Sequence, residues 1–169
     1  MFIYRRWRDE KRMIITNVRF YPVKVRSNAK GGVYWFLLKL ETDEGLEGWG
    51  EIIWNPYNPP TLAAMVRDVA HNYVIGQSPF NIEYLFAKIF AIHSKMHTDL
   101  NTMGIISGFE IACWDLIGKK TGQPIYNLLG GKINPKIRAY TYLYEKDDKI
   151  FCEDFWQLSE QCAQRAKEY

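Results

Sequence analysis

Two histidines and an aspartate stand at a spacing that could hold a metal ion. His93 and His97 are four residues apart, so on a helix they would share one face, and Asp99 follows just beyond them. Imidazole and carboxylate groups are common zinc ligands, but no motif such as HExxH supplies a third ligand or a general base. We therefore favour a polar outer face near a helix end over a metal site. His71 stands alone in a similar setting.

Two carboxylates lie in apolar sequence contexts and could do acid/base chemistry. These are Glu51 and Asp115. Carboxylates with shifted pKa values gather at active sites, but an unpaired buried carboxylate costs much free energy. We expect each of the two to accept hydrogen bonds or to pair with a basic neighbour, which is a structural role.

Composition excludes several classes of protein. The 169 residues are 47% hydrophobic and 24% charged, as in soluble globular domains, and the longest apolar runs are too short to cross a bilayer. The net charge of +3 is concentrated in residues 1–12, a basic leader that we expect to be flexible and that does not resemble a secretory signal. The neutral remainder argues against nucleic-acid binding. Three cysteines without a CxxC pair fit the reducing cytoplasm.

The first half of the chain predicts a three-stranded antiparallel meander. Residues 14–25 are rich in β-branched and aromatic residues, and Pro22 among them indicates an edge strand or a bulge. Residues 33–41 form a second strand. The sequence TDEG then closes a hairpin, with Gly45 free to adopt a positive φ, and residues 46–53 return as the third strand.

The hydrophobic period then changes from 2 to 3.6, which predicts helices. The first has the stripe Leu62, Met65, Val66, Val69 and Tyr73. The second begins after Ser78 and Pro79 and has the stripe Ile82, Leu85, Phe86, Ile89, Phe90 and Met96. The third covers residues 102–120, is apolar on most of its circumference, and contains small residues that permit close approach of neighbours: Gly104, Ser107, Gly108 and Ala112.

The last part of the sequence predicts a junction followed by a single strand and a single helix. Gly122 is placed to cap the third helix, and a short apolar helix and the double glycine of PIYNLLGG follow. Residues 137–144 read as a strand covered on both faces, and apolar residues recur at helical spacing from Glu153 onward. A lone strand and helix cannot bury their apolar faces or pair the strand's backbone groups.

Two separated motifs carry a family resemblance. The segment LLKLETDEGLEGWGE, followed by GFEIACWDLIGKKTGQPIYNLLGGK and IRAYTYLY, resembles the mandelate racemase and muconate-lactonizing branch of the enolase superfamily. The resemblance implies an α+β capping domain, with a three-stranded antiparallel meander followed by a helical bundle, over residues 13–132. Residues 133–169 would then be the first β/α unit of an incomplete (β/α) TIM-like barrel. Glu110 and Cys113 stand where the family more often has Asp and Leu.

The resemblance also implies a chemistry. Family members remove a proton alpha to a carboxylate, and a Mg²⁺ ion stabilises the resulting enediolate. Three acidic residues at the ends of barrel strands hold the ion, and a lysine or histidine serves as base. In the family these groups come later in the polypeptide than the position of Tyr169. We therefore expect no catalytic residue and no metal ligand in this chain, and no activity of the chain alone.

Substrate discrimination is the part of that chemistry that a capping domain supplies. Two capping loops of the family map to RSNAKGGVY and WNPYNPPT. The side chains there that could bind or cover a small acid are Asn28, Lys30, Tyr34, Trp54, Asn55 and Tyr57. Asn, Pro and aromatic residues are also common in turns for purely structural reasons, which is the competing interpretation. Tyr142 and Tyr144 could line a pocket, but we favour a role in filling the barrel.

The resemblance thus implies the N-terminal part of a Mg²⁺-dependent acid-sugar dehydratase. A racemase or epimerase of the same branch remains an alternative, and so does a non-catalytic capping or assembly module that pairs with a separate barrel chain. We expect a small-molecule carboxylate or acid sugar as partner, no nucleic acid, no membrane, a cytoplasmic location and a homo-oligomeric intact protein.

Overall fold

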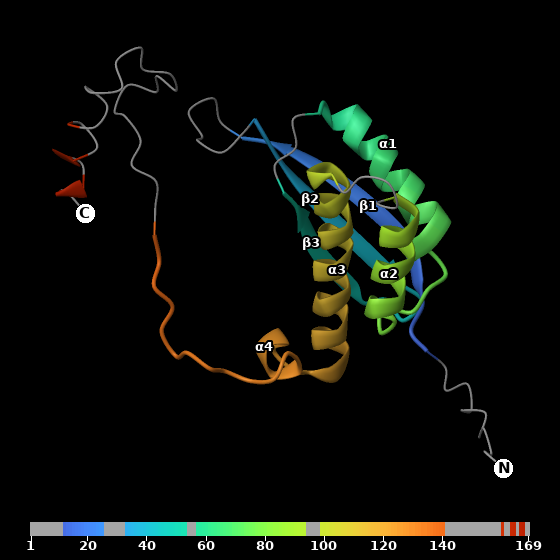
Figure 1. Ribbon diagram of the computed structural model, residues 1–169. Coiled ribbons are helices and arrows are strands. Elements are labelled where there is room, and N and C mark those ends of the chain that lie inside the picture. The colour runs from blue at the N-terminus through green and yellow to red at the C-terminus, as the bar shows by residue number, and fades with distance from the viewer. Residues whose placement is uncertain are drawn as a thin grey trace. The chain divides into compact units, whose positions relative to one another are not determined.

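The computed structural model describes residues 12–25, 33–53, 57–93 and 99–140, together with residues 160, 163, 164, 166 and 167 (Figure 1). The chain divides into two compact units, Met1–Gly131 and Lys132–Tyr169. The basic leader, apart from Arg12, lies outside the described residues.

The sheet of the first unit is the predicted meander. Its strands are β1 (Ile15–Lys24), β2 (Tyr34–Thr42) and β3 (Glu47–Ile52), antiparallel and in the order β1-β2-β3 (Figure 1). Pro22 lies on the edge strand β1 opposite Phe36, as its lack of an N–H donor requires. Gly45 has a φ of 78° in the hairpin turn, which confirms the prediction of a positive φ there.

The two faces of this sheet differ in burial. Side chains of alternate residues point to opposite faces, and Phe36, Leu38 and Leu40 of β2 are all buried in the hydrophobic core. Trp35, by contrast, is 57% exposed. The helices therefore cover one face of the sheet, and the odd-numbered residues of β2 lie on the other.

The helices are α1 (Pro59–Val69), the π-helix η1 (Ala70–Val74), α2 (Ile82–His93), α3 (Leu100–Thr121) and α4 (Ile125–Leu128). The three predicted helices are confirmed. Phe90 was wrongly placed in the buried stripe of α2: it is 39% exposed and its ring stacks on Phe86, with centroids 6.4 Å apart. The buried stripe of α2 is narrower than the predicted apolar stripe and consists of Ile82, Leu85 and Ile89. Met96 lies outside the described residues.

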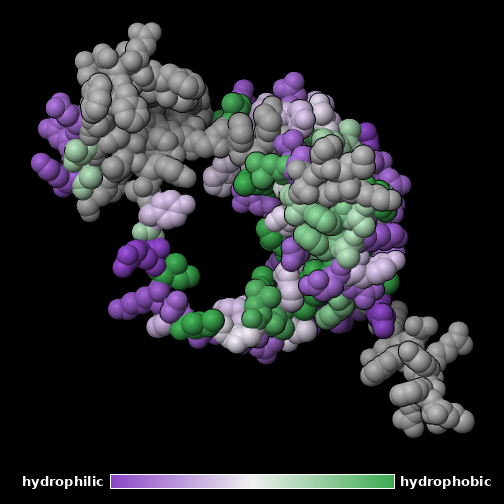
Figure 2. All heavy atoms as spheres, viewed as in Figure 1, coloured by the Kyte–Doolittle hydropathy of each residue, from purple (hydrophilic) through white to green (hydrophobic). Residues whose placement is uncertain are grey.

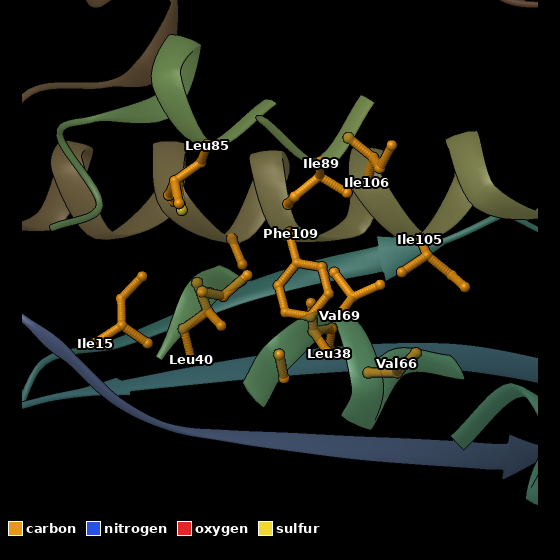
Figure 3. Packing of buried hydrophobic residues seen from close by; sticks show 14 of the residues in the cluster. Ile15, Leu38, Leu40, Val66, Val69, Leu85, Ile89, Ile105, Ile106 and Phe109 are labelled. Carbon is orange, nitrogen blue, oxygen red and sulfur yellow. The ribbon is translucent and has the colours of Figure 1, made fainter. Parts of the chain in front are cut away.

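The core lies between the sheet and the helices. Figure 3 shows Leu38 and Leu40 of the sheet facing side chains of α3, among them Ile105 and Phe109. The closest approach is between α3 and β3, where Gly50 and Gly108 bring the two backbones together. The expectation that small residues of α3 permit the close approach of a neighbouring element is confirmed, and that element is strand β3 of the sheet. On the side seen in Figure 2, hydrophobic and hydrophilic residues are intermixed over the helices.

The junction after α3 is also as expected. Gly122 has a φ of 65°, and its N–H donates to the Gly118 and Lys119 carbonyls at the end of the helix. α4 follows, although none of its residues is buried, and then come Gly130 and Gly131 with positive φ.

The strand predicted over residues 137–144 is not formed in its described part. Residues 137–140 have no regular secondary structure, and Ile137 and Tyr140 are 90% and 85% exposed. A strand needs neighbours for its backbone groups, and the described residues of this unit offer it none. Residues 141–144, with Tyr142 and Tyr144, lie outside the described part of the chain. Glu160, Ala163, Gln164 and Ala166 are helical, in agreement with the helix expected there.

Candidate functional site

Both candidate capping loops leave the sheet at the same end. The register places Lys24 at the end of β1 opposite Tyr34, and Ile52 at the end of β3 opposite Phe36. Segments 26–32 and 53–58 therefore start from neighbouring points, and we call this end of the sheet the loop edge. The Val25 N–H donates to the Val33 carbonyl at 3.0 Å and so closes the base of the first loop.

Two helices begin at the loop edge as well. α1 starts at Pro59 directly after the second loop. Proline suits the first turn of a helix because the backbone N–H groups there have no acceptor within the helix, so the lack of an N–H costs nothing. α3 runs antiparallel to β3, so that Gly104 in its first half lies against Ile53. Figure 1 shows the first turns of α1 and α3 at this end of the sheet.

The structure describes two of the six candidate substrate-binding residues. Tyr34 is half-buried at the loop edge, and its ring stacks on Phe36 with centroids 6.1 Å apart. Tyr57 is 45% exposed, two residues before α1. Asn28, Lys30, Trp54 and Asn55 lie outside the described residues. Contact of any of the six with a substrate stays a prediction.

Asp99 is the N-cap of α3. Its carboxylate accepts hydrogen bonds from the backbone N–H groups of Asn101 and Thr102, both at 2.9 Å, and from the Thr102 hydroxyl at 2.5 Å. These hydrogen bonds, the Thr102 hydroxyl first, lower the pKa of Asp99. This role was not anticipated, although Asp directly before an apolar helix is a known cap signal. The His93 side chain and His97 lie outside the described residues.

Asp115 has the structural role predicted for it. Its carboxylate accepts a hydrogen bond from the Trp49 backbone N–H at 2.8 Å, and this bond ties α3 to β3. The same carboxylate pairs with the Lys119 ammonium of α3 at 2.6 Å. Glu51 is exposed on the face of the sheet opposite the helices, so it is not a buried carboxylate, and its pairing with a basic neighbour stays a prediction. The strand alternation puts its neighbour Ile52 in the core and Glu51 outside.

An ionic network on the outer side of the sheet was not anticipated. The Lys39 ammonium lies 2.6 Å from Glu47 and 2.9 Å from Glu41, and Arg19 pairs with Glu41 at 2.7 Å. The hydrogen bond from Lys39, followed by that from Asn17, lowers the pKa of Glu41 to about 2. The hydrogen bonds to Glu47 and Glu41 raise the pKa of Lys39. The sequence contains a signal for this network: Lys39 and Glu41 are two residues apart in one strand, so their side chains lie on the same face of the sheet.

One hollow of about 180 Å³ lies between β1 and the helical segment of α1 and η1. Its lining includes Val18 and Phe20 of β1, and Arg67 and His71 of the helices. It lies over the middle and first half of β1, away from the loop edge.

Within the described residues no three His, Cys, Asp or Glu side chains form a group that could hold a metal ion. None of the described helices has the length and apolarity to span a membrane.

Sequence relatives share a large part of this chain. A D-galactonate dehydratase of Pectobacterium atrosepticum is 37% identical over 131 residues, which are 78% of this chain and 31% of that protein. A D-galactonate dehydratase of Variovorax paradoxus is 32% identical over 148 residues, 88% of this chain and 36% of that protein. The chain therefore spans about a third of the length of these curated relatives.

Solved structures share the fold. A mandelate racemase/muconate lactonizing enzyme-like protein of a Roseovarius species has a TM-score of 0.80 and 37% identity, and the match covers 92% of this chain and 39% of that one. A mandelate racemase/muconate lactonizing enzyme of a Sulfitobacter species has a TM-score of 0.81 and 35% identity over the same shares.

The family model gives the same assignment over most of the first unit. Residues 10–130 match the N-terminal domain of the mandelate racemase / muconate lactonizing enzyme family. The match begins just before β1 and ends at the double glycine. The chain therefore belongs to the mandelate racemase / muconate lactonizing enzyme family, by way of its N-terminal capping domain.

Proposed function

We propose that this chain provides the capping domain of an acid-sugar dehydratase of the enolase superfamily, with D-galactonate as the first substrate to test. The observation that carries the proposal is the 37% identity to a D-galactonate dehydratase over 131 residues, which are 78% of this chain. In this proposal residues 133–169 are the start of the barrel. The enzyme acts in the cytoplasm as a homo-oligomer, on a small acid sugar.

The catalytic centre of such an enzyme needs a divalent cation, and the described residues do not fit it. Mg²⁺ prefers several oxygen ligands in near-octahedral geometry, and no suitable group of acidic side chains occurs in the described part of the chain. In an enzyme of this class the ion stabilises the enediolate formed by proton removal. We assign none of that chemistry to the described residues.

The part assigned to this chain is recognition at the loop edge. The described ends of the two loops lie close together, at the end of the sheet where α1 and α3 begin, and from there the loops would cover a small substrate from one side. Tyr34 and Tyr57 mark the described ends of this surface. With Asn28, Lys30, Trp54 and Asn55 they would contact the part of the acid sugar distant from its carboxylate, and Lys30 is suited to an anionic group.

A chimera tests the proposal. Residues 13–131 of this chain replace the corresponding segment of the Pectobacterium D-galactonate dehydratase, and the product is followed by mass spectrometry. We expect the chimera to remove one water from D-galactonate in the presence of Mg²⁺, and the 169-residue chain alone to remove none. The matched control is the same relative with its N-terminal segment deleted, which we expect to be inactive.

Two kinds of result would contradict the proposal. Dehydration by the 169-residue chain alone would show that it carries its own catalytic groups. A folded chimera that leaves D-galactonate and other acid sugars intact, but exchanges their alpha proton without loss of water, would favour the racemase or epimerase alternative. A folded chimera with no reaction of either kind would favour a non-catalytic assembly module.

A further inference from the structure

The hollow between β1 and the helical segment of α1 and η1 has the size of a small ligand. Its volume is about 180 Å³, and Figure 1 shows α1 beside the edge strand β1. Small side chains leave the space open, because Ala63 of α1 and Ala70 of η1 line the helical wall. Liquid water occupies about 30 Å³ per molecule, so the hollow has room for about six waters or one small organic molecule.

Both walls of the hollow contain a break in regular secondary structure. In β1 the pairing with β2 has a β-bulge between Ile15 and Asn17. In the helical wall η1 is a π-helix, and the Ile75 N–H donates to the Ala70 carbonyl, five residues earlier, at 2.9 Å. Bulges and π-helical turns are both frequent next to functional sites. The hollow therefore combines two local features that are typical of such sites.

The floor of the hollow is apolar. Val18 and Phe20 of β1 pack on the helical side of the sheet, and Val66 of α1 and Ile75 complete this surface. Val18, Phe20 and Ile75 are only partly buried, so that water in the hollow contacts hydrocarbon. A ligand with an apolar body gains free energy when it replaces this water.

The helical rim of the hollow carries hydrogen-bond donors. Arg67 and His71 both line the hollow and are exposed, and neither forms an ion pair with another described residue. Asp68, the neighbour of Arg67 in sequence, accepts a hydrogen bond from Asn72 at 3.0 Å. A guanidinium can give a carboxylate two parallel hydrogen bonds, and an imidazole N–H can add another. This rim is therefore suited to a carboxylate.

One acidic residue lies close to the hollow without lining it. Glu41 accepts a hydrogen bond at 2.9 Å from Asn17, which does line the hollow. Lys39 and Arg19 pair with the same carboxylate at 2.9 Å and 2.7 Å, so two cations offset its charge. The charges around the hollow therefore favour an anion over a cation.

We propose that the hollow binds a small carboxylate with an apolar body, such as an aromatic or short aliphatic acid. The carboxylate lies at the rim and accepts hydrogen bonds from Arg67 and His71, and the apolar body covers Val18 and Phe20. An acid sugar fits less well, because its hydroxyl groups would lose water against these two side chains. Inorganic phosphate can reach Arg67 but leaves the apolar floor uncovered.

Benzoate is the probe for this site, titrated into the 169-residue chain and followed by ¹H–¹⁵N NMR. We expect the backbone amide signals of Val18, Phe20 and His71 to shift, with a Kd on the order of millimolar, as suits so small a molecule. Benzamide lacks the charge and formate lacks the apolar body, so each should bind at least about fivefold more weakly. D-galactonate and inorganic phosphate should not shift the signals of Val18 and Phe20.

Two variants test the rim and the floor separately. Arg67→Met should weaken benzoate binding about fivefold, the scale of an exposed ion pair. Ala63→Leu should abolish it, because the larger side chain fills the hollow. Lys24→Met, at the end of β1, removes a cation that does not line the hollow and should leave the Kd unchanged. Circular dichroism establishes that each variant is folded.

Three results would overturn the proposal. If benzoate shifts no signal at concentrations well above the expected Kd, the hollow does not take up such acids. If benzamide or formate binds as tightly as benzoate, either the charge or the apolar body is irrelevant. Benzoate-induced shifts that persist unchanged in both Ala63→Leu and Arg67→Met place the binding elsewhere on the protein. The proposal does not depend on the proposed function.

Discussion

Gly50 of β3 lies so close to Gly108 of α3 that neither position can accept a side chain. A Cβ on Gly50 would lie 2.0 Å from the Gly108 carbonyl oxygen. A Cβ on Gly108 would lie 2.7 Å from the Ile52 side chain. Because the first obstacle is backbone, the helix can accommodate a methyl group only by moving off the sheet.

Gly50→Ala is therefore expected to lower the free energy of unfolding by about 3 kcal/mol, the upper range for overpacking in a core. Gly45→Ala is the control, because a Cβ there meets no atom within 4 Å and the cost is only that of a positive φ, about 1 kcal/mol. Urea denaturation at one low protein concentration measures both. Equal losses in the two variants would show that α3 can move away from β3 at little cost.

The cap of α3 gives a second prediction. Asp99→Ala should lower the free energy of unfolding by about 1 kcal/mol, the usual cost of losing an N-cap side chain, whereas Asp99→Asn should retain most of it because the amide oxygen can accept the same bonds. Chemical denaturation checks the difference. If Asp99→Asn is as damaging as Asp99→Ala, the cap depends on charge and not on hydrogen-bond geometry.

The cap also predicts a pH dependence. The pKa of Asp99 is lower in the folded protein than its ordinary value of 3.8. The stability that its carboxylate contributes is therefore complete above pH 3.8 and is lost as the pH falls through the lower folded value. In Asp99→Asn this part of the acid sensitivity should disappear. The measurement is urea stability from neutral pH to the acid range.

The ionic network of the sheet gives a fourth prediction. Lys39→Met should raise the pKa of Glu41 from about 2 toward its ordinary 4.5, because the hydrogen bond from Lys39 is the largest cause of the shift. Glu41 stabilises the fold above pH 4.5, and this contribution fades as the pH falls toward 2, so the variant should lose less stability in that window. Carboxyl NMR titration measures the pKa. Lys24→Met, at the end of β1, is the control and should leave the pKa of Glu41 at about 2.

Cys113 should be chemically inert in the folded protein. It is 2% exposed, and burial, with a smaller contribution from the Glu110 charge, raises its pKa to about 12. The thiolate is the reactive form, so iodoacetamide at about pH 8 should modify Cys113 only after unfolding. Mass spectrometry of the peptide that contains it gives the answer. Rapid modification in native buffer would mean that α3 opens from the core.

Local signals explain why much of this fold could be predicted from sequence. Pro22 on an edge strand, Gly45 in the hairpin and Gly122 after α3 each satisfy a backbone requirement that depends only on near neighbours. The capping role of Asp99 was not predicted, although a polar position near a helix end was. A carboxylate beside two histidines fits a metal site and a helix cap equally well in sequence, and only the bonds to Asn101 and Thr102 decide between them.

Features that depend on distant residues were harder to predict. The exposure of Phe90 depends on which side of α2 packs against the rest of the protein. The hydrophobic period of the helix shows an apolar stripe but does not show how much of that stripe is covered. The absence of a strand at 137–140 follows from missing pairing partners among the described residues, although the alternation of the sequence suits a strand. The candidate loop residues were placed by resemblance alone, and only Tyr34 and Tyr57 among them are described.

The 22 residues of α3 form a helix about 33 Å long. Its first half lies beside the end of β3, and its last turn leads into α4 through Gly122. Because Gly50 and Gly108 hold the two backbones in close contact, α3 and β3 should move as one rigid unit, so that the first and last turns of α3 are mechanically coupled.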